Sequence, residues 1–324
     1  MELDPELTKN WLDFEQFKEK YQKVPVEEFP NNVLRAVSEP MVSVHIITYQ
    51  HADYIRDAIE GVLMQKTDFP FEIIIGDDES TDGTREICME YAEKYPDLIR
   101  LLLHKRENNI AILGKPSHIF QYAYNSFNLR GKYVAVCSGD DYWTDPQKLQ
   151  KQVEFMEGNE GYSLCYHNVI EKSREGNLET KKEGFPVPCT LLALNIFNRL
   201  PEEFFHAINE DNFMNQILEF YGERKYLEKV KPSIRRVHID SIWSRHKNGI
   251  KLDYKLNTQY QIFKAFQETK IKKRLAIAYL KTLYGKSKLV NKNRWLFIYI
   301  EAINKRMFWY LIPMFISMLK GKYF

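Results

Sequence analysis

Short apolar runs alternate with segments of helical periodicity along the first half of this chain. Four apolar runs bounded by polar or turn-forming residues predict buried strands: Val42–Thr48, Phe71–Gly76, Ile99–Leu103 and Tyr133–Cys137. Between them, apolar residues recur every three to four positions and predict helices: Asp53–Gln65, Thr81–Tyr95 and Ser117–Ser126. Strands that alternate with helices are typical of an α/β fold, in which helices cover a mainly parallel sheet.

The second half of the chain is patterned less regularly. The elements that we expect there are a helix over Pro146–Gly158, a strand over Ser163–Ile170, a loop or hairpin over Lys172–Gly184, a helix over Asp211–Tyr221 and a strand over Lys231–His238.

The two ends of the chain carry patterns of their own. Aromatic residues three to four positions apart between Trp11 and Tyr21 predict a short amphipathic helix that packs on the main domain. From about Lys247 onward the pattern is helical and basic. We therefore expect three parts: a helical preface over 1–40, a main α/β domain over 41–246 and a basic, aromatic helical extension over 247–324.

Charge is distributed unevenly, although the net charge is only +2. The segment Lys264–Phe324 carries 14 lysines and arginines against two acids, which gives +12 for this segment and −10 for the rest of the chain. A basic tail on an acidic body indicates an anionic partner surface.

The remaining bulk features predict a cytoplasmic protein. The four cysteines, Cys88, Cys137, Cys165 and Cys189, show no Cys-x-x-Cys pairing and no metal-ligand spacing, so we expect reduced thiols. The N-terminus is polar and acidic and lacks the apolar region of a signal peptide. No stretch reaches the ~18 apolar residues expected of a membrane span.

Two of the predicted strands end in adjacent aspartates. Asp77 and Asp78 follow the second strand, and Asp140 and Asp141 follow the fourth. Carboxylates at the carboxyl ends of parallel strands face the crevice in which α/β proteins bind ligands. A hard divalent cation relieves the repulsion between neighbouring carboxylates, and Mg²⁺ or Mn²⁺ takes one or two carboxylates together with phosphate oxygens. The pattern predicts one site for a nucleotide and a divalent metal, with a helix-capping turn as the simpler alternative for Asp140 and Asp141.

Six short strings between Val42 and Ser244 resemble, in order, the motifs of family 2 glycosyltransferases with the GT-A fold. In one-letter code they are VSVHIITY, IGDDESTDGT, GKY, SGDDYW, ED and RVH. The two strings that contain the aspartate pairs are specific together, although either alone is weak. The resemblance implies a GT-A fold and the transfer of a sugar from a nucleotide-diphosphate donor. It does not extend to the preface or to the C-terminal extension.

The resemblance implies a nucleotide site at the first two strand ends. Asp78 would accept the imide N–H of uracil, because a carboxylate is an acceptor and that N–H is a donor. Thr48 and Tyr49 would flank the same base, Tyr49 by stacking on it. Asp77 would hold the turn.

A metal site is implied at the fourth strand end. Asp140 and Asp141 would bind the cation and the ribose. Ser138 stands where the family often has a further aspartate, so which of the two aspartates binds the metal stays open. The family often has a histidine near His238 that meets the metal or the diphosphate, and Arg236 or Arg235 and Lys115 are candidates to offset phosphate charge. A solvated basic strand is the alternative for these candidates.

The string Glu210-Asp211 stands where the family has its catalytic base. An acceptor hydroxyl loses its proton as it attacks the anomeric carbon, and a carboxylate within hydrogen-bond reach takes that proton. By motif position Asp211 is the expected base and Glu210 the second candidate. The ordinary preference for acids at helix N-termini is the alternative. The implied reaction is a single displacement that inverts the anomeric centre of a sugar moved to a glycan or lipid-linked acceptor.

Other functional classes explain less of the sequence. A nucleic-acid-binding protein that acts through the basic tail would leave both aspartate pairs unexplained, so no nucleic acid partner is expected. A sugar-phosphate nucleotidyltransferase needs a glycine-rich basic loop after the first strand, and Thr48–Asp53 contains none. A degenerate, non-catalytic relative of the family stays open.

The C-terminal extension mixes large aromatics with basic residues. Trp295–Leu319 contains short apolar runs, and lysines and arginines flank its longest one. This composition suits the headgroup layer of an anionic membrane, which predicts peripheral attachment to the cytoplasmic face. The alternative is an extension packed on the main domain or on a second subunit, so an oligomer stays possible.

Overall fold

The computed structural model describes most of the chain. The described residues are 8, 10–30, 39–173, 176, 178–181, 186–237, 248–266, 269–289, 298, 301–302, 305 and 307–314. His238 and the tail aromatics Trp295, Phe297, Tyr299 and Phe315 lie outside these ranges. Their predicted roles therefore stay predictions.

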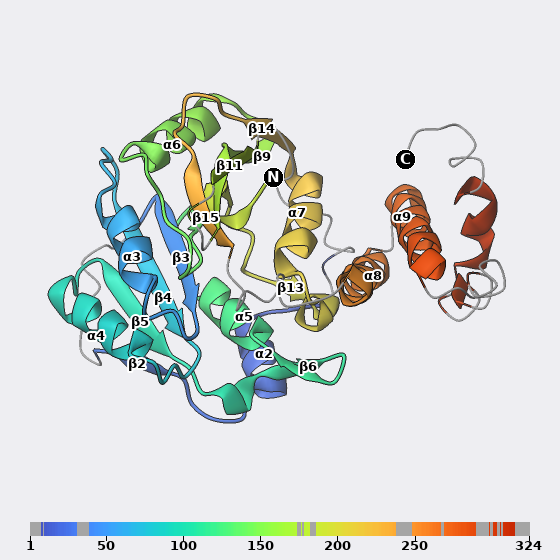
Figure 1. Ribbon diagram of the computed structural model, residues 1–324, viewed down its shortest axis with the longest axis horizontal. Coiled ribbons are helices and arrows are strands. Elements are labelled where there is room, and N and C mark those ends of the chain that lie inside the picture. Colours follow the sequence, from blue (N-terminus) through green and yellow to red (C-terminus); the bar gives the residue numbers. More distant parts are fainter. Residues whose placement is uncertain are drawn as a thin grey trace.

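An eight-stranded sheet forms the centre of the molecule (Figure 1). Its strands lie in the order β14 (Glu223–Tyr226), β9 (Tyr162–Tyr166), β12 (Leu192–Leu194), β8 (Tyr133–Val136), β3 (Val42–Thr48), β4 (Phe71–Asp77), β5 (Ile99–Leu103) and β2 (Glu27–Phe29). The four strands predicted first are neighbours, and they pair in parallel as β8-β3-β4-β5. Strands β12 and β2 are antiparallel to their neighbours. The predicted α/β fold with a mainly parallel sheet is therefore confirmed.

Side chains of the central strands enter two separate cores. Ile73 and Ile75 of β4 are fully buried in one core, and Ile74 is buried in the other, because successive side chains of a strand point to opposite faces. The first core includes residues of α3 (Ile55–Leu63), α4 (Thr84–Lys94) and α6 (Lys148–Gly158). The second includes residues of α2 (Phe14–Tyr21), α5 (Ile119–Phe127) and α7 (Glu210–Tyr221). Burial on both faces explains the unbroken apolar runs of the sequence.

One predicted strand is wrong in its extent. The run Ser163–Ile170 forms two strands, because the chain leaves the main sheet at His167 and Asn168. β9 stays in the main sheet, whereas β10 (Val169–Ser173) forms a second sheet with β11 (Leu178–Lys181) and β15 (Ser233–Val237). The predicted loop or hairpin after it contains the antiparallel β10–β11 pair.

The preface contributes strands as well as the predicted helix. Helix α2 begins with a reciprocal pair of hydrogen bonds between Asp13 and Gln16, which satisfies its first N–H groups. Before it, β1 (Trp11–Leu12) pairs with β13 (Leu200–Pro201), and after it β2 extends the main sheet. Strands of two or three residues carry no periodicity, and so the sequence pattern did not predict them.

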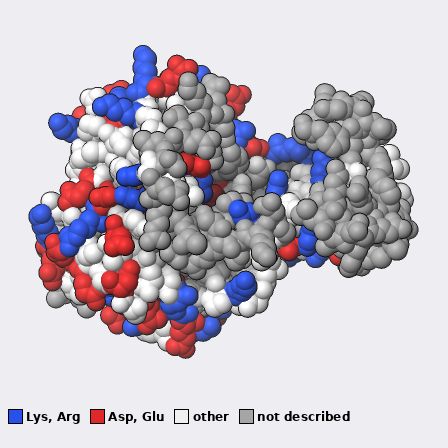
Figure 2. Space-filling view, in the orientation of Figure 1, with Lys and Arg blue, Asp and Glu red and all other residues white. Residues whose placement is uncertain are grey.

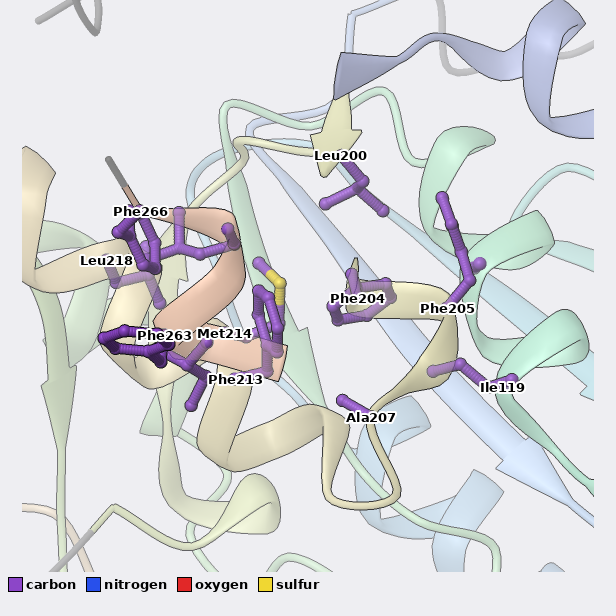
Figure 3. Packing of buried hydrophobic residues seen from close by; sticks show 14 of the residues in the cluster. Ile119, Leu200, Phe204, Phe205, Ala207, Phe213, Met214, Leu218, Phe263 and Phe266 are labelled. Atoms are coloured by element: carbon purple, nitrogen blue, oxygen red, sulfur yellow. The ribbon is translucent and has the colours of Figure 1, made fainter. Parts of the chain in front are cut away.

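The tail begins with two helices, α8 (Asn248–Ala265) and α9 (Thr269–Leu289). Helix α8 packs against α7 and the 3₁₀ helix η3 (Glu202–His206), and the rings of Phe220 and Phe266 stack with centroids 4.4 Å apart. Figure 3 shows Phe213, Met214 and Leu218 of α7 together with Phe263 and Phe266 in one continuous core. The start of the tail is thus built into the main domain.

Tail cations also meet acids of the body. Arg274 of α9 pairs with Glu219 of α7 at 2.8 Å, and Lys264 of α8 pairs with Glu203 at 3.5 Å. Figure 2 shows Lys and Arg gathered where the tail joins the body. Part of the basic excess is therefore neutralised inside the molecule. Within the described ranges, no helix has the length and apolarity needed to cross a membrane.

Candidate active site

The carboxyl ends of β4, β3 and β8 lie side by side and carry the predicted site residues. Thr48 is in register with Asp77, and the N–H of Asp78 donates to the Thr48 carbonyl over 3.1 Å. On the other side, the N–H of Gly139 donates to the β3 backbone over 2.9 Å. A Cβ at Gly139 would lie 2.6 Å from Thr48 Oγ1, so this close approach requires glycine. Parallel topology therefore brings both aspartate pairs to one edge of the sheet.

Asp77 holds the turn after β4, as its position suggested. Its Oδ2 atom accepts hydrogen bonds from Arg85 Nε at 2.5 Å and from the Ser80 N–H at 3.2 Å. The side chain is fully buried. Its Oδ1 atom is buried without a hydrogen-bond partner among the described residues, so Arg85 and Ser80 hold Asp77 in the turn through Oδ2.

Asp78 keeps one oxygen for a ligand. Its Oδ2 atom accepts hydrogen bonds from Arg106 Nη1 and Asn109 Nδ2, both at 2.9 Å. Its Oδ1 atom is buried and has no hydrogen-bond partner among the described residues. Burial raises the pKa of Asp78, although the bonds from Asn109 and Arg106 oppose that rise. A buried acceptor of this kind can receive a donor from a bound molecule.

Arg106 connects Asp78 to Tyr49. It begins the 3₁₀ helix η1 (Arg106–Asn108), and its guanidinium carbon lies 4.1 Å from the centroid of the Tyr49 ring. The Tyr49 side chain is 39% exposed. The neighbouring Thr48 is buried, and its Oγ1 atom shares a 3.1 Å hydrogen bond with Nδ1 of His51. The residues predicted to bind the base thus lie together, and the stacking of Tyr49 stays a prediction.

The two aspartates after β8 differ in exposure. Asp141 is 5% exposed, and its Oδ1 atom accepts a 3.0 Å hydrogen bond from the backbone N–H of Arg236. Burial and the adjacent charge of Asp140 raise the pKa of Asp141 well above its usual range. Asp140 is partly exposed and is the more accessible of the two.

This donor set fits a Mg²⁺ or Mn²⁺ ion. Both cations accept one or two carboxylates and leave other positions to phosphate oxygens and water. A cation would also relieve the mutual repulsion that acts on Asp140 and Asp141. No group of three or more His, Cys, Asp and Glu side chains with the spacing of a metal site occurs in the described ranges. In these ranges Asp140 and Asp141 are therefore the candidate ligands, and their role stays a prediction.

Arg236 holds the turn that contains the two aspartates. Its Nη1 atom donates to the Asp140 carbonyl over 2.9 Å, its guanidinium is paired with Asp57 of α3, and it lies 4.5 Å from the ring centroid of Tyr142. These contacts engage the side chain with the protein itself. The predicted contact of Arg236 with a diphosphate stays a prediction.

Its neighbour Arg235 lies close to both acidic groups of the site. The guanidinium donates to Glu171 over 3.3 Å, and its charge opposes the rise in the pKa of both Asp141 and Asp211. Lys115, by contrast, is an exposed residue of the hairpin formed by β6 (Ile110–Ile112) and β7 (Lys115–Ser117). In the described part of the chain, no hydrogen bond or ion pair joins Lys115 to the aspartates.

The acids at the start of α7 form a cluster with a histidine. The Oε1 atom of Glu210 lies 2.9 Å from Nε2 of His118, just before α5. Burial and the charge of Glu210 raise the pKa of Asp211 to about 6. Burial disfavours the charged form of His118, but the Glu210 carboxylate outweighs this effect and raises the pKa of the histidine. Asp211 thus titrates close to neutrality, where a general base is most effective.

A pocket with about 570 Å³ of empty space, part of it open to solvent, joins this cluster to the strand ends. It lies between α7 and the sheet face formed by β8 and β12, and Glu210 and Asp211 line it. Ser138, which precedes the Gly139-Asp140-Asp141 turn, lines it as well. The structure therefore brings the predicted base and the predicted metal turn to one pocket.

Several residues of this site were not predicted. Arg106 and Asn109 follow β5 in a charged loop, and His118 lies in the predicted helix over Ser117–Ser126, so the local pattern gives none of the three a role. Asn215 was assigned to the helix over Asp211–Tyr221 without a role. No local pattern could reveal them, because their partners lie far away in the sequence: Asp78 for Arg106 and Asn109, and Glu210 for His118.

Parts of two curated proteins are similar in sequence to this chain. An uncharacterized protein of Mycobacterium tuberculosis (strain H37Rv) is 43% identical over 145 residues, which are 45% of this chain and 39% of that protein. An uncharacterized glycosyltransferase of Methanocaldococcus jannaschii is 31% identical over 153 residues, which are 46% of this chain and 49% of that protein. The matches thus span less than half the length of these curated relatives.

A solved structure has a similar fold. The crystal structure of S. aureus TarS 1-349 in complex with UDP-GlcNAc superposes with a TM-score of 0.53, covering 86% of this chain and 92% of that one at 17% identity. At this identity the likeness shows the fold alone, a GT-A fold. The sequence profile of Glycosyl transferase family 2 matches residues 43–229, which is more than half of the chain. With the strand-end aspartates and the acidic start of α7 in family order, the chain belongs to glycosyl transferase family 2.

Proposed function

We propose that the protein transfers a sugar from a uridine-diphosphate donor to a hydroxyl of a glycan or lipid-linked saccharide, with inversion at the anomeric carbon. The supporting observation is the pocket, which joins Asp211 on α7 to Ser138 beside the Asp140-Asp141 turn. A donor whose diphosphate lies at that turn presents its sugar to Asp211. Uracil reaches Asp78, whose free Oδ1 atom accepts the imide N–H.

Asp211 acts as the general base. As the acceptor oxygen bonds to the anomeric carbon, its proton passes to the Asp211 carboxylate. The bond from the anomeric carbon to the diphosphate breaks, and its electron pair leaves with the nucleoside diphosphate. Because bond formation and departure occur on opposite faces in one displacement, the configuration inverts. Glu210 and His118 hold the base in a charged cluster.

Asp140 and Asp141 hold the divalent cation in this proposal. A bound Mg²⁺ or Mn²⁺ would neutralise the negative charge that develops on the departing diphosphate. The accessible Asp140 suits direct ligation, and the buried Asp141 is oriented by the backbone N–H of Arg236. Arg235, close to both acidic groups, offsets part of the charge around the diphosphate.

A lipid-linked acceptor would place the protein at an anionic membrane surface. Near the described end of the tail, Trp309 and Ile312 are 81% and 68% exposed. Trp309 lies in the 3₁₀ segment η4 (Phe308–Tyr310) and Ile312 follows it, and Lys273 and Arg274 of α9 are exposed cations of the same tail. Exposed apolar and basic side chains together favour peripheral attachment.

Calorimetric titration with UDP, GDP, dTDP and CDP, each with and without Mn²⁺, tests the proposal. We expect UDP to bind most tightly and to require the metal. Asp140→Ala and the near-isosteric Asp141→Asn should abolish the metal-dependent part of UDP affinity. Unchanged Mn²⁺-dependent affinity in both variants would refute the metal assignment. If none of the four nucleotides binds, the chain is a degenerate relative and the proposed function is wrong.

A further inference from the structure

A buried amide without partners lines the pocket beside Asp211. Asn215 lies one helical turn after Asp211 on α7 and is 3% exposed. Neither its Oδ1 nor its Nδ2 atom has a hydrogen-bond partner among the described residues. Almost all buried amide groups in folded proteins are paired, so this one marks a place where a partner is missing.

The walls around this amide are apolar. Val134 and Val136 of β8, Leu191, Ala193 of β12 and Leu218 of α7 line the same pocket. Each of these five side chains is at least nine-tenths buried. The other polar side chains that line the pocket are Ser138, Tyr122 and the two acids that begin α7.

Few sugar substituents complement such a surface. An unmodified sugar ring presents hydroxyls to every side, and apolar walls leave those hydroxyls unpaired at a cost in free energy. An acetamido group presents a carbonyl acceptor and an N–H donor in one plane, with a methyl group beside them. Its carbonyl can accept from Asn215 Nδ2, its N–H can donate to Oδ1, and its methyl group can pack on the valines and leucines.

We infer that the pocket beside Asn215 binds the acetamido group of an N-acetylated sugar, so that Asn215 determines the substrate class. The inference rests on the proposed function and narrows it. The acetamido group belongs either to the sugar of the donor or to the acceptor, since both come together at Asp211. In both cases a sugar that lacks the group leaves the Asn215 amide unpaired and binds more weakly.

The donor arm of the test compares UDP-GlcNAc with UDP-glucose by calorimetry in the presence of Mn²⁺. We expect the acetamido donor to bind roughly tenfold more tightly, which is the size of effect that one or two net hydrogen bonds give. Asn215→Leu keeps the side-chain volume and removes the amide, and it should reduce this preference to less than about twofold. Asn215→Ala serves the same purpose if the leucine variant does not fold.

Two controls make the result specific. Gln216→Leu removes an amide from the next position of α7, outside the residues that line the pocket, and should keep the full preference. UDP alone should bind equally to the wild type and to all three variants, because it has no sugar to place in the pocket. Loss of UDP binding by the wild type would count against the proposed function itself, as well as against this inference.

The acceptor arm uses the UDP-loaded protein. Saturation-transfer NMR compares methyl N-acetylglucosaminide with methyl glucoside, again for the wild type, Asn215→Leu and Gln216→Leu. A preference in this arm that depends on Asn215 would place the acetamido group on the acceptor, and one in the donor arm would place it on the donor. If UDP binds but neither arm shows a preference, or if the preference survives in Asn215→Leu, the inference is wrong while the proposed function stands.

Discussion

Single carboxylates of this site have roles that their partners decide. Asp77 and Asp78 are adjacent, and each has a buried Oδ1 atom without a hydrogen-bond partner among the described residues, yet Asp77 is paired with Arg85 inside the turn whereas Asp78 is paired with Arg106 beside Tyr49. Asp140 is more exposed than Asp141, and the Oδ1 atom of Asp141 accepts a hydrogen bond from the backbone N–H of Arg236. At the start of α7, burial and a neighbouring charge give Asp211 the pKa of a base.

The pKa of Asp211 predicts the pH dependence of turnover. Burial and the Glu210 charge raise this pKa from 3.8 to about 6, so the fraction of ionised base increases as pH rises through about 6. We expect kcat to rise roughly tenfold per pH unit below that value and to level off above it. A pH–rate profile measures this inflection, and a profile that stays flat through pH 6 would contradict the role of Asp211 as the base.

Asp211→Asn provides the matching variant. It should fold and bind UDP with Mn²⁺ as the wild type does, because the amide replaces the carboxylate with the same shape. Transfer should fall by at least about a hundredfold, the usual contribution of a positioned base. Full turnover by this variant would rule out Asp211 as the base and leave Glu210 as the remaining candidate.

We expect Asp78 to determine which nucleobase the donor carries. The imide nitrogen of uracil donates a hydrogen bond, and the corresponding nitrogen of cytosine accepts one. Asp78→Asn places an amide donor at the position of Oδ1. The amide oxygen of the asparagine still accepts the hydrogen bonds from Arg106 and Asn109. We expect the affinity for UDP to fall by about tenfold and the ratio of CDP affinity to UDP affinity to rise. Calorimetry of the two nucleotides measures this ratio, and an unchanged ratio would mean that Asp78 does not contact the base.

At the scale of elements, α8 positions the start of α7. The N–H of Ile208 donates to Asn257 Oδ1 over 3.0 Å, and the N–H of Asn209 donates to Thr258 Oγ1 over 3.1 Å. Asn209 immediately precedes Glu210 and Asp211. A helix of the C-terminal extension therefore supports the backbone that carries the proposed base. Because of this support, the extension and the main domain are less separate than the predicted boundary at residue 247 implies.

This support can be measured with a single substitution. Thr258→Val keeps the shape of a buried side chain and leaves the Asn209 N–H without its acceptor, so we expect a loss of about 1–3 kcal/mol in the free energy of unfolding and a lower kcat. Thr282→Val on α9 is the control, because the Thr282 hydroxyl bonds within its own helix to Ala278. Chemical denaturation compares the two. Equal losses in both variants would mean that α8 has no special role in placing α7.

At the scale of the whole molecule, charge serves two purposes. Ion pairs such as Arg274–Glu219 dock the basic tail on the acidic body. Other tail cations, with Trp309 and Ile312, remain exposed on the same extension. The tail is thus part of the fold at α8 and is available to a partner surface further on.

Vesicle binding tests the exposed part of the tail. We expect the protein to sediment with vesicles of phosphatidylcholine and phosphatidylglycerol, less with phosphatidylcholine alone, and less at high salt. The double variant Trp309→Ser, Ile312→Ser should bind at least about tenfold more weakly, because it loses the apolar contact. Leu113→Ser removes an exposed leucine from the β6–β7 hairpin of the body and should bind as the wild type does. Equal binding by all three proteins would exclude the tail as the attachment surface.

The sequence by itself determined the four parallel strands at the centre of the sheet, the order of the helices between them and the edge at which the strand-end aspartates lie. Strands buried on both faces must be apolar throughout, and polar residues just beyond them must lie at the carboxyl edge of a parallel sheet. Asp78, Asp140 and Asp211 could therefore be named from local pattern together with the resemblance to a family. The short strands of the preface and the break at His167 and Asn168 could not, because pairing partners decide them.

The tertiary structure alone decided how these residues work together. Three features depend on side chains that are distant in sequence. Asp78 is paired with Arg106, Arg106 also contacts Tyr49, and Asn215 lines a pocket without a hydrogen-bond partner among the described residues. Burial and charge depend on every element packed around a residue, and local sequence contains no record of them. For that reason the sequence predicted sugar transfer from a nucleotide donor. The packing of α7 against the sheet, which forms the pocket beside Asn215, led to the proposal of an N-acetylated sugar as the substrate.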